Sequence, residues 1–193
     1  MKIQVVTPPT ELPLTLQDIK THLRIEDSES EYNNDLTSLI EVAAEWVLAN
    51  CHLTLLYTVY RCYFDKFETP LKLPVYPVGG IQPISYVDVD GNSQTISSYQ
   101  LDFLDCPAKV YPAINAEWPE LQEGKINPIS IDVNAGIAEE VSEVPALAKH
   151  LIRLLVAHWF VNREAVGTGT TKEIEFSANE LVKMLRVNEF EAF

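Results

Sequence analysis

The spacing of apolar residues changes twice along this chain, and that change restricts the possible folds more than any other feature. Residues 1–55 carry apolar side chains at helical spacing, residues 56–141 alternate apolar with polar side chains, and residues 142–193 return to helical spacing. A period of 3.6 belongs to a helix with one buried face, and a period of two belongs to a strand. The sequence therefore predicts an α+β fold, with a helical core made by the N- and C-terminal segments and a small antiparallel β region inserted between them.

Two helices are expected before residue 55. The first runs over residues 16–24, with Thr15 as its N-cap and Asp18 in its first turn, where the helix dipole favours an acid. The second runs over residues 31–50. Its apolar face comprises Tyr32, Leu36, Leu39, Ile40, Ala43, Trp46 and Val47.

Short runs rich in β-branched and aromatic residues fill the middle segment. They are "YTVYRCYFDKF", "LKLPVYPV", "ISYVDVDG", "YQLDFL", "AKVYPAI" and "PISIDVNAGI", separated by proline and glycine. Seven of the twelve prolines lie between Pro70 and Pro119. Because proline cannot donate to a sheet ladder, we expect these strands to be short and partly at edges.

A long helix is expected over residues 144–165, with Ser142 as its N-cap. One half of its circumference is apolar, and the other half carries charged residues. Val156 and Phe160 fall inside the charged stripe, next to Arg153 and Arg163. Apolar residues in such a stripe indicate either a second contact surface or the scattered exposed apolar residues that are common on protein surfaces.

The segment after this helix is predicted to begin as the flexible loop "VGTGTTKEIEF" with an extended end. The motif "SANE" at Ser177 matches a capping box and predicts the start of a final helix. The tail "NEFEAF" contains Phe190 and Phe193, which we expect to dock either on this chain or on a partner. The residues predicted to form interfaces are Val156, Phe160, Arg163, Phe190 and Phe193.

The charge of the chain opposes nucleic-acid binding. The sequence contains 28 acidic and 14 basic residues, a net charge of -14, whereas binding to phosphate backbones rests on Lys and Arg. An odd number of cysteines, three, argues against a disulfide framework and favours a reducing compartment. The sequence shows no secretion signal and no apolar run long enough to span a membrane, so no membrane association is expected.

The stretch "SYVDVDGNSQT" has the oxygen-rich spacing of a calcium loop. Counted from Asp88, however, Ser93 stands where an EF-hand needs glycine and Tyr99 stands where it needs glutamate. An Asp-Gly-Asn sequence between alternating runs is typical of a hairpin turn, because glycine and asparagine tolerate positive φ. The sequence favours a hairpin over a metal site.

No other pattern indicates catalysis or a cofactor. "GTGTTK" lacks the glycine that a phosphate loop places directly before lysine. The four histidines show no zinc-ligand spacing, and none of the cysteines lies in an activating motif. We therefore expect a protein that is not an enzyme and needs no metal or cofactor.

Four segments, taken in order, resemble one known family. The segments "LTLQDIKTHLRI", "VDVDG" followed by Tyr99, "WPEL" and "AHWFVNREAV" have the order and spacing found in head-tail connector (head-completion adaptor) proteins of tailed bacteriophages and prophages. The resemblance spans about Val6 to Val166 and is weaker after Gly167.

The resemblance implies a structural protein of the virion neck, present in the host bacterial cytoplasm before assembly. Members of the family form a ring beneath the portal, matching its twelvefold symmetry, line part of the DNA channel, and contact the next head-completion or tail protein. Such a ring needs a heterologous interface, in which two different surfaces meet. Carboxylates lining the channel would repel passing DNA and oppose its binding.

Two other classes of function stay open on the sequence. The first alternative is an acidic, non-enzymatic adaptor or binding module of another cellular assembly. The second is an enzyme whose site is assembled from residues without a motif. For the connector, we expect Phe160→Asp to weaken assembly with little loss of stability, since the helical pattern places Phe160 away from the core.

Overall fold

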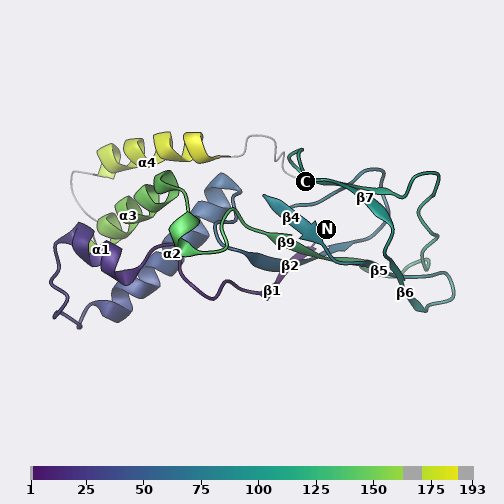
Figure 1. Cartoon of the computed structure of the whole chain (residues 1–193), viewed down its shortest axis with the longest axis horizontal. Helices are drawn as coiled ribbons and strands as arrows, with labels where there is room; N and C mark the ends of the chain where they lie inside the picture. Colours follow the sequence, from purple (N-terminus) through teal and green to yellow (C-terminus); the bar gives the residue numbers. More distant parts are fainter. Residues whose placement is uncertain (1, 163–170, 187–193) are drawn as a thin grey trace. The chain divides into compact units, whose positions relative to one another are not determined.

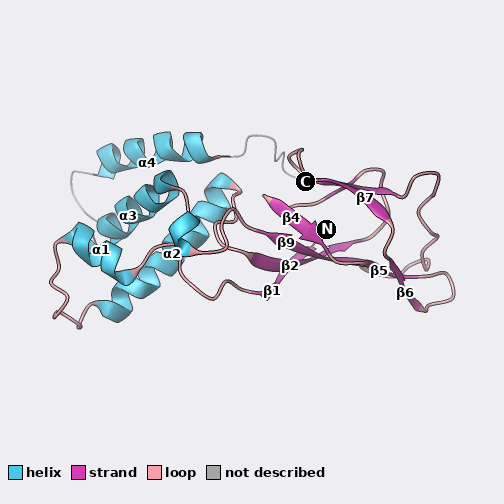
Figure 2. Cartoon of the chain, in the orientation of Figure 1, coloured by secondary structure: helices cyan, strands magenta, loops and turns pink. Residues whose placement is uncertain are grey.

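The computed structural model describes residues 2–162 and 171–186, which divide into two compact units. The helical unit comprises Thr10–Leu56 and the described residues from Ile137 onward, and the sheet unit comprises the described residues up to Pro9 together with Tyr57–Gly136. Figures 1 and 2 show the helices in the first unit and the sheets in the second. The predicted α+β class is confirmed. No helix in the described part of the chain is long and apolar enough to cross a membrane.

The first two helices follow the local sequence signals closely. Helix α1 spans Leu16–Leu23, and the Thr15 hydroxyl accepts a hydrogen bond from the Asp18 backbone N–H at 3.0 Å, as the cap pattern predicts. It ends where Arg24 adopts a left-handed conformation with φ 59°. Helix α2 spans Asn33–Cys51.

The third helix begins later than expected. Helix α3 spans Ala146–Val161 with Pro145 at its N-cap position, so Ser142 is not the cap. Ser142 lies instead in a short 3-10 helix, Val141–Glu143, whose capping box is formed by Glu140 and Glu143.

The last helix also differs from the expectation. Helix α4 spans Thr171–Leu185 without interruption, so the predicted extended piece before Ser177 is wrong and Ser177 lies inside the helix. The described side chains of α4 show one covered side, with Ala178 buried and Met184 exposed.

Helices α2 and α3 form the centre of the helical unit, because each packs against the other and against both α1 and α4. Its apolar face meets that of α2, and the side chains buried in this unit include Leu36, Ile40, Val47, Leu151, Ile152 and Leu155. The chain leaves this unit and returns to it at neighbouring positions. Leu56 and Ala138 form a β-bridge there, and the Ala138 N–H donates to the Leu55 carbonyl at 3.1 Å.

The sheet unit contains two antiparallel sheets. The larger has the order β1 (Lys2–Thr7), β2 (Thr58–Phe64), β9 (Ile129–Ala135), β5 (Ile84–Val87) and β6 (Ser93–Ile96), and β4 (Val78–Ile81) also pairs with β9. The smaller has the order β3 (Leu71–Lys72), β8 (Lys109–Pro112) and β7 (Tyr99–Asp102). The strands are short, as the proline content predicts.

In the central strands of the larger sheet, buried residues alternate with more exposed ones, and the buried ones line the core of this unit. Every second residue of β2 and of β9 is buried. These residues join one cluster with side chains of the smaller sheet, among them Cys62, Ile131, Leu71 and Val110. The Tyr99 hydroxyl donates to the Ile81 carbonyl at 2.9 Å and so links the two sheets. Trp118 of the "WPEL" motif stacks on Phe67 with ring centroids 4.6 Å apart.

Candidate assembly surfaces

The stripe of α3 that contains Val156 and Phe160 is covered inside the chain. Val156 is 0% exposed, so the expectation that it lies on an open surface is wrong. The Phe160 ring is half-buried and meets the Tyr32 ring edge to face, with centroids 5.5 Å apart.

Two contacts of this stripe involve α1 and the residue before α2. Arg153, on the same stripe, lies 3.7 Å from the Asp18 carboxylate of α1, and Tyr32 directly precedes α2. The helical pattern of α3 alone could not reveal this contact, because it depends on tertiary packing. An interface role for Phe160 stays a prediction, and Arg163, Phe190 and Phe193 lie outside the described residues.

A buried lysine is bonded to the backbone of the connector between α1 and α2. The side chain of Lys20 is 3% exposed, and its ammonium donates to the carbonyl oxygens of Glu29 at 2.8 Å and Asp27 at 3.3 Å. These acceptors belong to the acidic connector between α1 and α2. A charged donor bonded to two backbone acceptors keeps the connector ordered against the helices.

The outer side of α2 is acidic and partly apolar. Glu41 and Glu45 are exposed there, one helical turn apart, together with Val42 and Leu48. Neither glutamate forms an ion pair with a lysine or arginine among the described residues. This side of the helical unit is therefore a charged surface that an assembly partner can contact.

Strand β1 forms an exposed edge of the larger sheet. All six of its residues are exposed, including Ile3 at 47% and Val5 at 50%. Ile3 pairs with Cys62 and Val5 with Tyr60, so both side chains lie on the same face of the sheet as the core residues of β2. The core-side face of β1 thus carries two apolar side chains that are each about half exposed. This strand was not expected from the sequence.

The loop between β7 and β8 presents two large apolar side chains. The "YQLDFL" run ends as a strand at Asp102, and the two residues that follow, Phe103 and Leu104, are 55% and 87% exposed. The Asp102 carboxylate accepts from the Leu104 N–H at 3.2 Å, and Asp105 forms an ion pair with Lys109 at the start of β8. The loop is therefore held by its own polar contacts.

The "VDVDG" stretch is the predicted hairpin. The Asp88 carboxylate accepts from the N–H groups of Asp90 and Asn92 and from the Gln94 amide, and these hydrogen bonds hold the pKa of Asp88 below its ordinary value. Gly91 has φ +85°, a conformation that favours glycine. The Asp88 carboxylate, which stands where a calcium ligand would in the sequence pattern, stabilises the turn through these hydrogen bonds.

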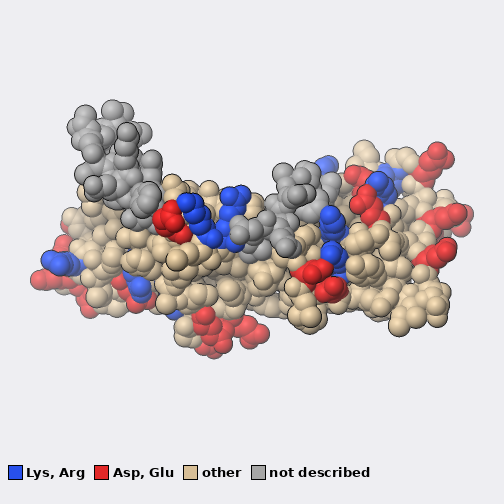
Figure 3. Space-filling model, turned by 90° about the horizontal axis from the view of Figure 1, so that it is seen from above, with Lys and Arg blue, Asp and Glu red and all other residues tan. Residues whose placement is uncertain are grey.

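The described residues show few features of a catalytic or metal-binding site. Burial raises the pKa of the Cys62 thiol to about 12 and also raises the pKa of Cys51, so neither is an activated nucleophile. The structure contains no group of three or more His, Cys, Asp or Glu side chains placed to hold a metal within its described part. On the face shown in Figure 3, acidic and basic side chains form small separate groups, and no broad basic patch is visible.

Comparison with known proteins finds a match to one family model and to solved structures that share one fold. Residues 13–81, just over a third of the chain, match the family model of phage gp6-like head-tail connector proteins. The resemblance to head-tail connector proteins that the sequence indicated is therefore confirmed. No curated protein sequence matches the chain significantly.

Solved structures match over the whole chain. A chain from the neck of an empty gene transfer agent (GTA) particle, computed with C6 symmetry, is similar with a TM-score of 0.79 and 19% identity. A chain from the virion of the native GTA particle has a TM-score of 0.77 and 19% identity, and one from the neck of the native particle, computed with C12 symmetry, has 0.75 and 18%. Each match covers 100% of this chain and 99% of the other. At this identity the likeness establishes the shared fold.

Proposed function

We propose that this protein is a structural connector in the neck of a phage-like virion. It forms a homo-oligomeric ring between the portal and the next head-completion or tail protein, and it acts through protein contacts without catalysis. The observation that carries the proposal is the match of residues 13–81 to the head-tail connector family.

The fold supports the same role. Its likeness covers the whole chain, and the similar chains come from particle necks computed with C6 and C12 symmetry. A closed ring needs two different surfaces on each subunit. The edge strand β1, the β7–β8 loop and the outer side of α2 supply several distinct candidates. We propose a dodecamer when the protein is assembled on the portal.

The charge of the chain supports a role around moving DNA. A net charge of -14 repels phosphate, so a ring of such subunits lets DNA pass without binding it tightly. We expect no complex with duplex DNA in an electrophoretic mobility assay at physiological salt. A salt-sensitive complex at micromolar protein would contradict this part of the proposal.

Gene disruption tests the function as a whole. The gene is inactivated in the phage or prophage that encodes it, and the particles are imaged by electron microscopy. Heads without attached tails are expected, and a wild-type copy supplied in trans restores tailed particles. Tailed, infectious particles from the disrupted strain would overturn the proposal. Antibody labelling of wild-type particles is expected at the neck.

A further inference from the structure

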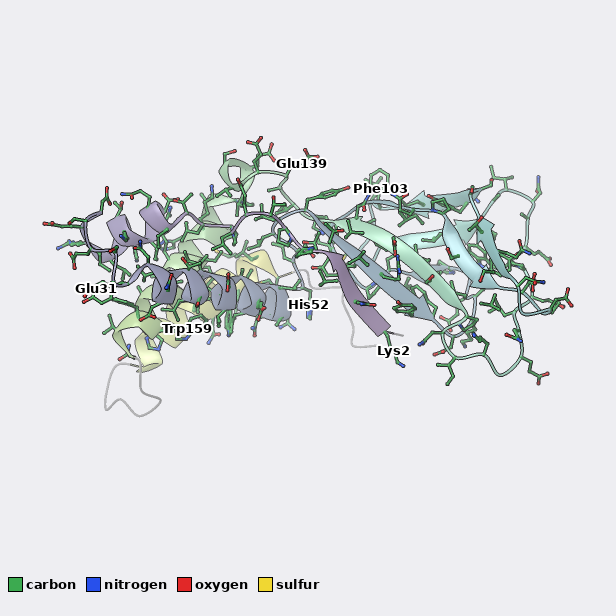
Figure 4. All side chains as sticks on the ribbon, turned by 90° about the horizontal axis from the view of Figure 1, so that it is seen from below. Lys2, Glu31, His52, Phe103, Glu139 and Trp159 are labelled. Carbon is green, nitrogen blue, oxygen red and sulfur yellow. The ribbon has the colours of Figure 1, made fainter. Side chains whose placement is uncertain are left out.

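Strand β1 leaves one edge of the larger sheet open. It stands at the end of the strand order, and among the described strands it pairs with β2 alone. Figure 4 labels Lys2 and shows β1 at the margin of the sheet unit. The outer edge of β1 therefore presents backbone N–H and C=O groups that no described strand pairs with. Such an edge is a template that an extended segment can complete.

The two faces of β1 differ in their chemistry. The core-side face holds Ile3 and Val5, which are 47% and 50% exposed. The opposite face holds Lys2 and Gln4, because successive side chains of a strand alternate between its faces. Val6, 42% exposed, follows at an irregularity in the pairing with β2. A strand that completes this edge must therefore carry apolar residues on one face and polar residues on the other.

The C-terminal segment, defined as residues 187–193, has the required pattern. Its last five residues, "EFEAF" at 189–193, have the same order of polar and apolar residues as "KIQVV" at 2–6. We propose that the C-terminal segment of one copy pairs with β1 of the neighbouring copy and extends the larger sheet by one strand. This inference rests on the proposed ring and names one of its contacts.

The side chains of the two stretches are complementary when both run in the same direction. Phe190 then lies beside Ile3 on the core-side face, where the two apolar side chains cover each other. Glu189 lies beside Lys2 on the opposite face. Lys2 is exposed and forms no ion pair with any other residue that the structure describes. The alternation thus brings apolar next to apolar on one face and acid next to base on the other.

The C-terminal segment is long enough to cover the whole edge. Seven residues follow Arg186, the last described residue, and an extended chain advances about 3.3 Å per residue, so they span about 23 Å. Strand β1 has six residues and spans about 20 Å at the same rise. One segment can therefore satisfy the open edge from end to end.

Exchange of the segment between neighbours gives the ring a directional contact. The segment follows α4 of the helical unit in the chain, whereas β1 belongs to the sheet unit, so the pairing joins two different surfaces. Such a contact is heterologous, repeated rotation closes it into a ring, and exchange of a short element costs the fold little. One added strand covers less than the roughly 800 Å² per partner of a typical stable interface, so other surfaces complete the ring interface.

Disulfide formation between two different variants tests the pairing. Ile3→Cys and Phe190→Cys are made in separate full-length chains with a Cys106→Ser background, since the other two cysteines are buried. The chains are mixed at high concentration under mild oxidation and analysed by non-reducing intact mass. Mixed dimers are expected at least fivefold above the same-kind dimers. They are also expected at least fivefold above those formed with Glu191→Cys, whose side chain lies on the opposite face.

Each other outcome overturns a definite part of the inference. Equal yields with Phe190→Cys and Glu191→Cys, or no mixed dimers at all, would overturn the strand pairing. A single chain carrying Ile3→Cys and Phe190→Cys is oxidised in parallel. An internal disulfide in that chain without mixed dimers would show that the segment docks on its own copy, and would overturn the exchange.

The gene disruption separates this contact from the connector function. Wild-type rings in electron micrographs without mixed dimers would refute the exchange and leave the function standing. Tailed particles from the disrupted strain would refute the function, whatever the disulfide result.

A substitution in the C-terminal segment gives an independent measurement. Phe190→Asp is expected to weaken self-association at least tenfold in sedimentation velocity, because buried aromatic anchors dominate interface energies. Leu104→Asp is the matched control, since Leu104 is 87% exposed and belongs to neither paired stretch. Equal association of the two variants would overturn the proposal. Circular dichroism checks that both remain folded.

Discussion

Replacing Lys20 with methionine is expected to destabilise the helical unit. The change keeps most of the buried aliphatic chain and removes the ammonium that donates to the carbonyls of Glu29 at 2.8 Å and Asp27 at 3.3 Å. A hydrogen bond from a charged donor contributes about 1.5–3 kcal/mol. The longer bond is weaker, and the freed carbonyls lie in an exposed connector where water can reach them. We therefore expect a loss of about 2 kcal/mol.

Thermal and urea unfolding followed by circular dichroism measure this loss. For a chain of this length, about 2 kcal/mol corresponds to a fall of about 4–8 °C in Tm. Lys183→Met is the matched control, because Lys183 is 69% exposed and pairs with Glu180 on the surface of α4. An exposed pair contributes about 0–1 kcal/mol, so the control should barely change Tm. Hydrogen exchange of residues 25–32 should quicken in Lys20→Met alone.

The opposite outcome has a definite physical meaning. Buried charges carry a desolvation cost, and their replacement by apolar residues of similar size is sometimes stabilising. If Lys20→Met is as stable as the wild type, the two hydrogen bonds do not outweigh that cost. The account of Lys20 as the anchor of the connector would then be refuted.

Further substitutions and treatments test individual features. Phe160→Asp is now expected to cost about 2 kcal/mol of stability, because the structure gives its ring an aromatic neighbour within the helical unit, and denaturant unfolding will measure it. Native protein treated with a thiol reagent at pH 8 should be modified at Cys106 and protected at Cys62, as mass spectrometry can show; rapid modification of Cys62 would contradict its burial. Because the pKa of Cys62 is raised to about 12, its contribution to stability is lost as pH rises from about 9 towards that value. Gly91→Ala should lower stability by about 1–2 kcal/mol because of its positive φ, whereas Gly80→Ala, whose added carbon would meet nothing within 4 Å, should not.

Local signals predicted the elements that depend on neighbours in sequence. Thr15 caps α1, every second residue of β2 is buried, and Gly91 forms the turn between β5 and β6. Each of these follows from spacing or from the chemistry of one residue type. The α+β class followed from the same spacing, because the change of period is itself a local property.

Long-range packing explains what the sequence did not predict. Val156 lies in a stripe that looks half-charged on a helical wheel, and it is buried only because other helices pack around α3. Strand β1 alternates polar and apolar residues over positions 2–5, but the run is short, none of its residues is buried and its partner β2 lies far along the chain, so this signal was overlooked. Phe103 and Leu104 continue an apolar run and were assigned to a strand, although the ladder to β8 ends at Asp102.

The β-bridge between Leu56 and Ala138 has a consequence for how such a protein can be altered. The backbone departs from the helical unit and rejoins it at adjacent positions, with the Ile137 N–H bonded to the Thr54 carbonyl at 3.1 Å. The bridge is parallel, so both backbone segments run in the same direction and a tight two-residue turn cannot join them. The intervening residues are not a self-contained module, because strand β1, which precedes the helical unit in the chain, pairs with β2 in their larger sheet. A replacement domain would need ends that lie side by side, and it would also have to provide a partner strand for β1.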